Sequence, residues 1–331
     1  MKRRLTALVK GTFSVVLVAA VLHSLDGAAI VAAIRQLTPA ALGATVLLVA
    51  LQTVIIGWRW HRIVTILGGH LAARDAVSWV FVGMFFNSVL PTSVGGDAVR
   101  IWLLRRSGAT LGVSLGSVTI ERGTGIVILG LIVSACVPAV WGTLHSPTLR
   151  LTLASIGPML LAGLVIAALV DKVAVAMLPN RLADALRWLG QGLRRLAANP
   201  RELAEVAFLG IVASLTGLLA VYVLGESLAI GLMLPAYIVL VGGSVLMSLL
   251  PISLGGWGVR ELTMVALFGA VGCKPEQALA LSLLWGILPV LVSLPAGLFW
   301  RRGRRAETAG FDEIEKGASA EPSPQDPNRP S

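Results

Sequence analysis

The chain has 331 residues, of which 56% are hydrophobic and 13% are charged, and its mean hydropathy is +0.84. Because soluble domains carry about 25% charged residues, this composition excludes a soluble enzyme and indicates a polytopic membrane protein. Its spans must be helices, since a bilayer offers the backbone no hydrogen-bond partners. The net charge of +10 comes from basic residues beside apolar runs, which is typical of membrane orientation signals and not of nucleic-acid binding.

Six apolar runs are long enough to cross a bilayer, which takes roughly 20 residues. They are 5–23, 39–60, 110–140, 149–170, 203–224 and 276–300. The first run follows three basic residues and resembles a signal peptide, but no convincing cleavage site follows it, so we expect a retained span. Two further apolar regions, 75–106 and 235–271, are each interrupted by a proline and a glycine pair.

The two interrupted regions carry the same motif. Residues 88–100 read SVLPTSVGGDAVR and residues 248–260 read SLLPISLGGWGVR, with eight of thirteen positions identical at an offset of 160. Proline ends a helix and glycine permits a tight turn. The return limb 96–106 would rise only about 16 Å as a helix, half of the ~30 Å apolar core. We therefore predict that both regions are re-entrant helical hairpins.

The basic residues predict the orientation of the chain. They cluster at the N-terminus, at both ends of 75–106, in the connection 171–201 and after residue 300, whereas 141–148 and 225–234 contain none. By the positive-inside rule, both termini and the connection 171–201 are cytoplasmic, and the two hairpins enter the membrane from opposite sides.

When the predicted elements of the first half are shifted by 160 residues, they coincide with the predicted elements of the second half. We expect 39–140 and 199–300 to be two copies of one three-part unit. The chain crosses the membrane three times between their starts, so the copies are inverted. The predicted fold is thus an all-α membrane protein with inverted repeats, six full spans and two re-entrant hairpins. Secondary transporters often have this arrangement, with substrate at the repeat interface.

Two polar segments flank the second copy. The connection 171–201 contains a leucine stripe at 180–198 that predicts an amphipathic helix. This helix either lies in the cytoplasmic headgroup region or packs on the protein's own spans. Residues 303–331 are rich in proline and glutamate, which predicts a disordered cytoplasmic tail.

The repeated motif supplies the candidate binding residues. A helix that restarts after a glycine pair presents unpaired N–H groups and a positive dipole end, where a headgroup phosphate can bind. The alternative is that serine and glycine only close a tight turn. An arginine in each motif is costly at membrane depth unless it is paired, ligand-bound or able to reach the interface. The candidate substrate-binding residues are Ser93, Gly95, Gly96, Asp97, Arg100, Glu121, Arg122, Ser253, Gly255, Gly256, Arg260 and Glu261.

Pairing among these charges would lower the cost of burying them. The expected pairs are Glu121 with Arg100 or Arg260, and Arg122 with Asp97 or Glu261. Glu261 is not expected to pair with Arg260, because adjacent residues do not face each other on a helix. One interpretation is that these ion pairs only hold the hairpins together. The functional alternatives are that a substrate anion completes the set of charges, or that Glu121 or Glu261 carries a proton. Trp257 stands in the second motif where the first has Asp97, so the site is predicted to be asymmetric.

The motif NSVLPTSVGGDAVR, the Glu121–Arg122 pair and the motif LLPISLGGWGVRE resemble the transmembrane, flippase-like domain of lysylphosphatidylglycerol synthases and its stand-alone relatives. The resemblance covers 1–302 as one domain. It implies a bacterial inner-membrane protein that moves a lipid or a lipid-linked headgroup between leaflets, and relatives are associated with hopanoid synthesis and glycolipid assembly. The synthases continue into a soluble aminoacyl-transferase domain, whereas a short polar tail follows here, so synthase activity is not implied.

The leading hypothesis is a flippase for an anionic phospholipid, a glycolipid or a hopanoid-type lipid. One alternative is an enzyme of membrane-lipid synthesis with Glu121 or Glu261 as its acid or base. Another is an accessory subunit that docks a cytoplasmic lipid-synthesis enzyme through 171–201. The expected partners are membrane lipids with anionic headgroups, such an enzyme and further copies of the chain. The two cysteines and four histidines show no metal-ligand spacing, so no metal, cofactor or cysteine nucleophile is predicted.

Overall fold

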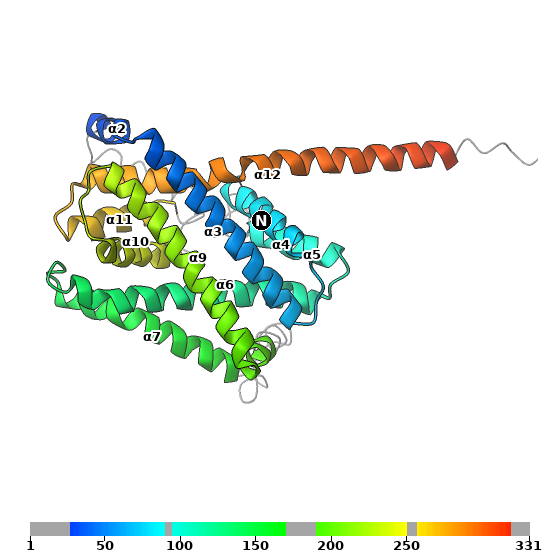
Figure 1. The fold of residues 1–331 in the computed structure, drawn as a ribbon, viewed down its shortest axis with the longest axis horizontal. Coiled ribbons are helices and arrows are strands. Elements are labelled where there is room, and N and C mark those ends of the chain that lie inside the picture. The colour runs from blue at the N-terminus through cyan, green and yellow to red at the C-terminus, as the bar shows by residue number, and fades with distance from the viewer. Residues whose placement is uncertain (1–26, 90–94, 170–189, 250–256, 319–331) are drawn as a thin grey trace, which may run out of the picture.

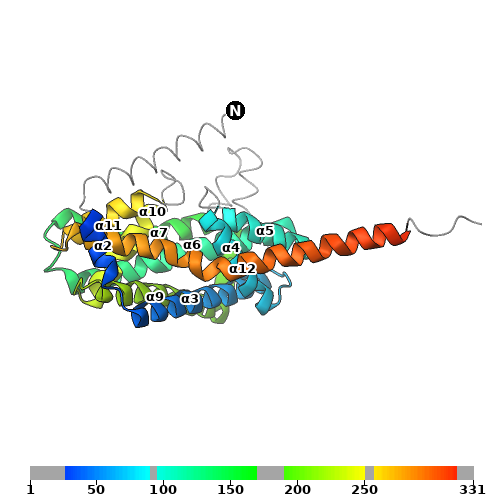
Figure 2. The same cartoon turned by 90° about the horizontal axis from the view of Figure 1, so that it is seen from above.

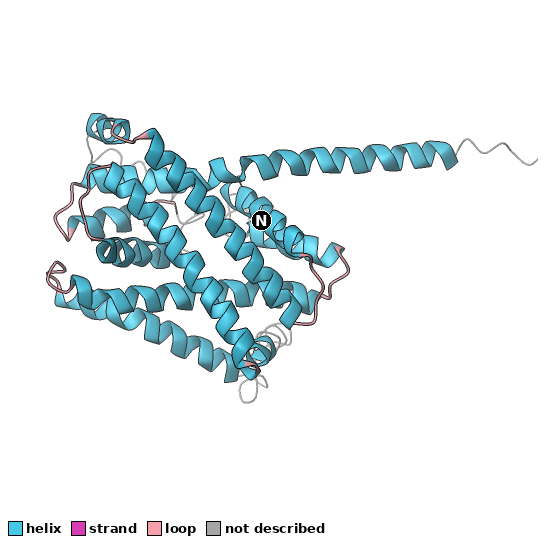
Figure 3. Ribbon diagram, viewed as in Figure 1, coloured by secondary structure: helices cyan, strands magenta, loops and turns pink. Residues whose placement is uncertain are grey.

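The computed structural model describes residues 27–89, 95–169, 190–249 and 257–318 (Figure 1). These residues form helices and loops, and no strand occurs among them (Figure 3). The all-α class expected from the composition is therefore confirmed.

Within the described ranges, five helices are long and apolar enough to cross a membrane. They are α3 (Pro39–Ile66), α6 (Leu111–Cys136, extended by the 3-10 turn Val137–Val140), α7 (Pro147–Leu169), α9 (Pro200–Ser227) and the first part of α12 (Pro275–Ala318). They confirm five predicted spans, while the predicted span 5–23 lies outside the described residues. Caps fix several starts: Thr38 and Thr110 accept hydrogen bonds from backbone N–H groups three residues on, as N-cap residues do.

The two interrupted regions form pairs of short helices. The first pair is α4 (Ala73–Val89) and α5 (Gly95–Arg106), and the second is α10 (Leu234–Ser248) and α11 (Val259–Gly269). The longest of them has 17 residues and rises about 25 Å, less than the ~30 Å apolar core. The helices of each pair pack against each other. Their re-entrant placement in a bilayer stays a prediction.

The order of helices repeats along the chain, and equivalent helices exchange partners. With the offset of about 160 residues, α3, α4, α5 and α6 correspond to α9, α10, α11 and α12. Helix α4 packs against α12, and its counterpart α10 packs against α6. The long helices α3 and α9 lie side by side and form the most extensive contact in the bundle (Figures 1 and 2). The two copies thus interlock, and their inverted relation to a membrane stays a prediction.

The apolar cores differ between the copies. The largest cluster joins α6, α9, α10, α11 and α12, with Tyr237 and Phe268 fully buried in it. A smaller cluster surrounds the fully buried Trp60 between α3, α4, α5 and α6. Helix α7 packs against α6 and is otherwise little covered, and the short α2 (Gly27–Arg35) packs on α12. The smaller apolar core of the first copy leaves room for polar groups beside Trp60.

The structure bears on both polar segments, the connection 171–201 and the segment from residue 303. Residues 190–198 are helical, and Leu193 and Leu196 are buried against α3, α6 and α9. The described part of the leucine stripe therefore packs on the protein's own spans, and 180–189 lie outside the described residues. Helix α12 continues to Ala318 and extends beyond the bundle (Figure 2), so it includes the first part of the segment 303–331. The disorder expected of that segment stays a prediction.

Candidate functional site

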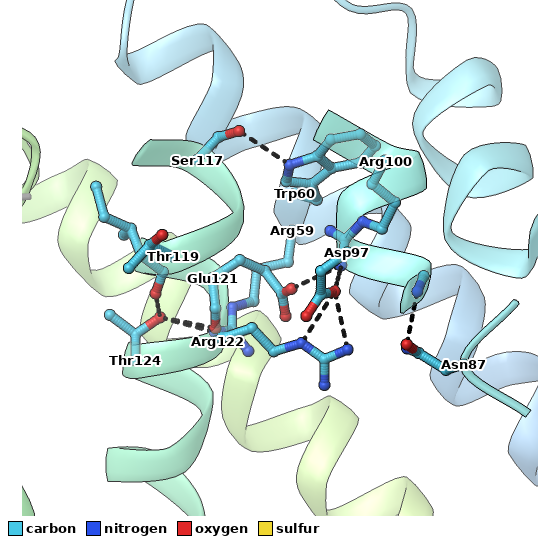
Figure 4. A network of polar contacts seen from close by, with 12 residues as sticks. Arg59, Trp60, Asn87, Asp97, Arg100, Ser117, Thr119, Glu121, Arg122 and Thr124 are labelled. Atoms are coloured by element: carbon cyan, nitrogen blue, oxygen red, sulfur yellow. Dashed lines mark hydrogen bonds and ion pairs between the residues drawn. The ribbon is translucent and has the colours of Figure 1, made fainter. Parts of the chain in front are cut away.

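The charged residues of the first motif meet those of α6 in one cluster (Figure 4). Because α5 begins at Gly95, Asp97 lies in its first turn and Arg100 follows one turn later on the same face. Helix α6 brings Glu121 and Arg122 against them. Of the alternative pairs expected from the sequence, Glu121 with Arg100 and Arg122 with Asp97 are confirmed.

Small residues bring α4 and α5 close enough to place this cluster. A Cβ at Gly96 would overlap the backbone carbonyl of Gly83, so the two helices touch through their backbones. The Gly96 N–H donates to Oδ1 of Asn87 at 2.7 Å. Gly96 therefore permits a close approach of the two helices. The glycine pair starts the helix instead of preceding it.

Arg100 is the most enclosed charge of the first motif. Its Nη1 donates to Glu121 Oε2 at 3.0 Å and lies 3.5 Å from Asp97 Oδ1. The guanidinium carbon lies 4.3 Å from the centre of the Trp60 ring, and the indole N–H of Trp60 donates to Ser117 Oγ at 3.1 Å. The Arg100 side chain is 4% exposed. The alternative that Arg100 reaches an interface is therefore wrong.

Arg122 lies at the open side of the cluster. Its Nη2 and Nε donate to Asp97 Oδ1 at 2.9 and 3.2 Å. The Arg122 side chain is 46% exposed, whereas that of Asp97 is 12% exposed. The cluster therefore runs from an accessible arginine at its edge to the buried Arg100, with Asp97 shared between the two.

A third arginine, Arg59, belongs to the cluster and was missed. It lies at the end of the predicted span 39–60 and was not among the candidate residues, but α3 continues to Ile66 and buries it. Its Nη2 donates to the backbone carbonyl of Glu121 and to Thr124 Oγ1, the latter at 2.7 Å. Gly125 and Gly210, on α6 and α9, leave the space that its guanidinium fills. Arg59 therefore joins α3 of the first copy to α9 of the second.

A cavity of about 200 Å³ opens beside these charges. One wall is polar and comes from the charged cluster, and the other is formed by α3 and α4. The lining residues are Thr53, Ile56, Val80, Gly83, Met84, Asn87, Asp97, Arg100, Glu121 and Arg122.

Two donors of Arg100 have no hydrogen-bond partner within the described part of the chain. These are Nε and Nη2, and both atoms are buried. A buried donor without a partner costs about 1–3 kcal/mol, and more when it is charged. The buried charges of the cluster balance, because Arg59 and Arg100 face Asp97 and Glu121, and the fifth charge is on the half-exposed Arg122. An anion that reached the two donors of Arg100 would supply the missing acceptor.

The second motif forms a different and closed arrangement. Glu261 is fully buried and accepts hydrogen bonds from the Gly258 N–H at 2.6 Å and from Ser282 Oγ at 3.2 Å. Arg260 donates from Nε and Nη2 to Glu261 Oε1, the former at 3.1 Å, and from Nε to Ser282 Oγ at 3.2 Å. The Trp257 ring stacks on this guanidinium at 4.9 Å. The second arginine is thus paired within its own copy.

The expectation that Arg260 and Glu261 do not pair is wrong. Gly258 is the N-cap of α11 with a φ of 87°, and the Glu261 carboxylate folds back and accepts a hydrogen bond from the Gly258 N–H. This turns the carboxylate toward the start of the helix, where the long side chain of Arg260 reaches it. The alternative pairs of Arg260 with Glu121 and of Glu261 with Arg122 are not formed.

The remaining candidates cannot be placed in either cluster. Ser93, Ser253, Gly255 and Gly256 lie outside the described residues. A single site between the two motif tips therefore stays a prediction. Among the residues that the structure describes, no group of three or more His, Cys, Asp or Glu side chains could hold a metal ion. The chemistry available in the first cluster is recognition of an oxyanion by guanidinium groups.

Comparison with known proteins identifies the family of the chain. Residues 7–297 match the family model described as Lysylphosphatidylglycerol synthase TM region, and this range includes both motifs and every described helix that packs in the bundle. No curated protein matches the chain. By this match, the chain belongs to the lysylphosphatidylglycerol synthase transmembrane-region family of multi-pass helical membrane proteins.

Proposed function

We propose that this protein moves a lipid with an anionic headgroup between the two leaflets of a bacterial inner membrane, with both chain termini in the cytoplasm. The observation that carries the proposal is the open donor edge of Arg100. This arginine is buried at the wall of a cavity, and its Nε and Nη2 have no partner among the described residues. Ionisable residues at membrane depth mark substrate paths in many membrane proteins.

The arrangement of the helices supports movement around this site. Helix α4 packs on α12 and α10 packs on α6, so each copy is held by a helix of the other. Arg59 also joins the copies, because its guanidinium contacts α6 and lies against Gly210 of α9. A rocking of one copy against the other would change the surroundings of the cavity. This is the alternating-access movement expected of proteins built from inverted repeats.

The second motif has a supporting part in this proposal. Arg260 and Glu261 satisfy each other and Ser282, so they hold α11 against α12 and offer no open donor edge. The headgroup site therefore lies in the first copy. This narrows the site expected from the sequence, which placed the headgroup between the two motif tips.

Lipid movement in proteoliposomes tests the proposal. The purified chain is reconstituted with a fluorescent phosphatidylglycerol, and the fraction that dithionite quenches is followed over time. Protein-containing vesicles should exchange the lipid faster than protein-free vesicles. Ile56→Trp fills the cavity and should slow this exchange, whereas Val54→Trp, two residues away on an exposed position of the same helix, should not. Equal rates with and without protein would reject lipid translocation.

A further inference from the structure

The repeat gives the bundle two equivalent short helices, α5 and α11, and different contacts hold them in place. Helix α11 buries the apolar side chains of Met264 and Phe268, both with no exposed surface, and the ring of Phe268 meets that of Tyr237 edge to face. Helix α5 buries one large apolar side chain, that of Leu104, and otherwise buries charged groups and glycines. Helices within a membrane associate through van der Waals packing and interhelical hydrogen bonds. Apolar packing therefore holds α11, whereas polar contacts hold α5.

The ion pairs of the two motifs differ in what they join. Two ion pairs fasten α5 to α6, with nitrogen–oxygen distances of 3.0 and 2.9 Å, and they are Arg100–Glu121 and Asp97–Arg122. In the second motif, Arg260 pairs with the next residue of α11 itself. A movement of α5 away from α6 therefore breaks two ion pairs, whereas a movement of α11 leaves its own pair intact.

The surroundings of α5 leave it room to move. Its contact with α4 runs through the backbones of Gly83 and Gly96, so no side chain of these two residues locks one helix into the other. Helix α4 packs against both α3 and α12 and is held by them. The face of α5 opposite Arg100 is exposed, at Ala98, Trp102 and Arg105. A pivot of α5 toward this exposed face separates it from α6 and widens the cavity beside Arg100.

The two ion pairs of α5 differ in burial, which sets the order in which they separate. Arg122, in the outer pair, is 46% exposed, and water and salt weaken an ion pair at such a position. In the inner pair, Arg100 and Glu121 are 4% and 7% exposed. Breaking a buried pair is costly because each charge stays without a partner. The outer pair therefore separates first, and the inner pair separates when water follows into the cavity.

We infer that α5 is a gate at the cavity beside Arg100, that its ion pairs to α6 keep this gate closed, and that the equivalent helix α11 is fixed. Elements with few buried apolar contacts are the ones that open most readily, and α5 is such an element. The gate goes beyond the proposed function, because its opening requires no lipid.

Thiol accessibility in the full-length chain in detergent tests the gate. Both native cysteines are replaced by serine, and a single cysteine is placed at one of two positions that are equivalent in the repeat, as Leu104→Cys on α5 or Met264→Cys on α11. Both side chains have no exposed surface, so a maleimide reacts there only when the helix opens. We expect Leu104→Cys to react about tenfold or more faster than Met264→Cys, as for a helix with fewer apolar contacts, and both to react equally fast in denaturing detergent. Equal rates in the native protein would overturn the inference.

The same assay tests the outer ion pair. Arg122→Ala removes this pair and leaves the buried charges of the cluster balanced, so labelling of Leu104→Cys should accelerate several-fold while labelling of Met264→Cys stays unchanged. Arg105→Ala, which removes an exposed arginine of α5, should accelerate neither.

Salt provides a second measurement that needs no change at Arg122. Raising the ionic strength from about 0.05 M to about 1 M screens a half-exposed ion pair, so it should accelerate labelling of Leu104→Cys when Arg122 is present and not in Arg122→Ala. If neither Arg122→Ala nor high salt changes the labelling rate of Leu104→Cys, the inference that the ion pairs close the gate is wrong.

These measurements separate the gate from the proposed function. Faster labelling on α5 in a protein that exchanges no lipid would keep the gate and reject translocation. Lipid exchange by a protein in which the two positions react equally fast would keep translocation and reject the gate.

Discussion

Glu261→Ala is expected to destabilise the protein strongly, because Glu261 holds the start of α11. The carboxylate is fully buried and accepts hydrogen bonds from the Gly258 N–H, from Arg260 and from Ser282. Removing it leaves the Arg260 guanidinium, whose side chain is only 15% exposed, without its counter-charge. It also leaves the Gly258 N–H at the start of α11 without its acceptor.

The size of the effect follows from the burial of the pair. Removing one partner of a buried ion pair costs about 3–5 kcal/mol, because the other charge stays buried without compensation. Folded proteins are stable by about 5–15 kcal/mol, so the variant should lose about a fifth or more of that margin. A matched control is Asp75→Ala, which removes the acidic partner of another sequence-adjacent pair, Arg74–Asp75. There the side chains are 90% and 43% exposed, and the cost should stay below about 1 kcal/mol.

The assay is reversible unfolding in mixed micelles, in which the mole fraction of denaturing detergent is raised and helix content is followed by circular dichroism. We expect the midpoint of Glu261→Ala to fall well below that of the unaltered protein, and that of Asp75→Ala to stay near it. A Glu261→Ala variant within about 1 kcal/mol of the Asp75→Ala control would refute a structural role for the second motif.

Three further predictions concern other parts of the molecule. Gly96→Ala should separate α4 from α5, because its Cβ would overlap the Gly83 carbonyl, and thermal unfolding should occur at a lower temperature; an unchanged midpoint would contradict the backbone contact. Arg59→Gln leaves one buried arginine against the two buried carboxylates and removes the contacts of its guanidinium with the Glu121 carbonyl and Thr124, and should lower the temperature of thermal unfolding; an unchanged midpoint would contradict a structural role for Arg59. Burial raises the pKa of the Cys273 thiol, which lies between α11 and α12. Its maleimide labelling should therefore still accelerate above pH 8.5, the ordinary thiol pKa, where the labelling of an unburied thiol levels off.

The sequence predicted the helices of this protein well, because apolar length and capping residues are local properties. Helix α5 was expected at 96–106 and is found at Gly95–Arg106. The partners of Arg100 were predicted only as alternatives, since the choice between α6 and the second motif depends on how the two copies pack. Glu121 became the partner because α6 crosses α5 in the same copy.

Other parts of the site depend on features that no local pattern contains. Arg59 is bound by a backbone carbonyl of α6 and by the space left at Gly125 and Gly210, and backbone carbonyls leave no signal in a sequence. The pairing of Arg260 with Glu261 depends on the positive φ of Gly258, which redirects the Glu261 side chain. A rule for neighbouring residues inside a regular helix does not hold at such a helix start.

The central claim is that the open edge of Arg100 carries the headgroup of a translocated lipid. The most direct measurement is the initial rate of phosphatidylglycerol exchange in proteoliposomes that contain equal amounts of folded Arg100→Gln or Arg105→Gln protein. The two positions lie on the same helix, one buried and one exposed. The account predicts a rate about tenfold or more lower for Arg100→Gln, as expected for the loss of charge-assisted hydrogen bonds, and an unchanged rate for Arg105→Gln. Equal rates for the two variants would contradict it.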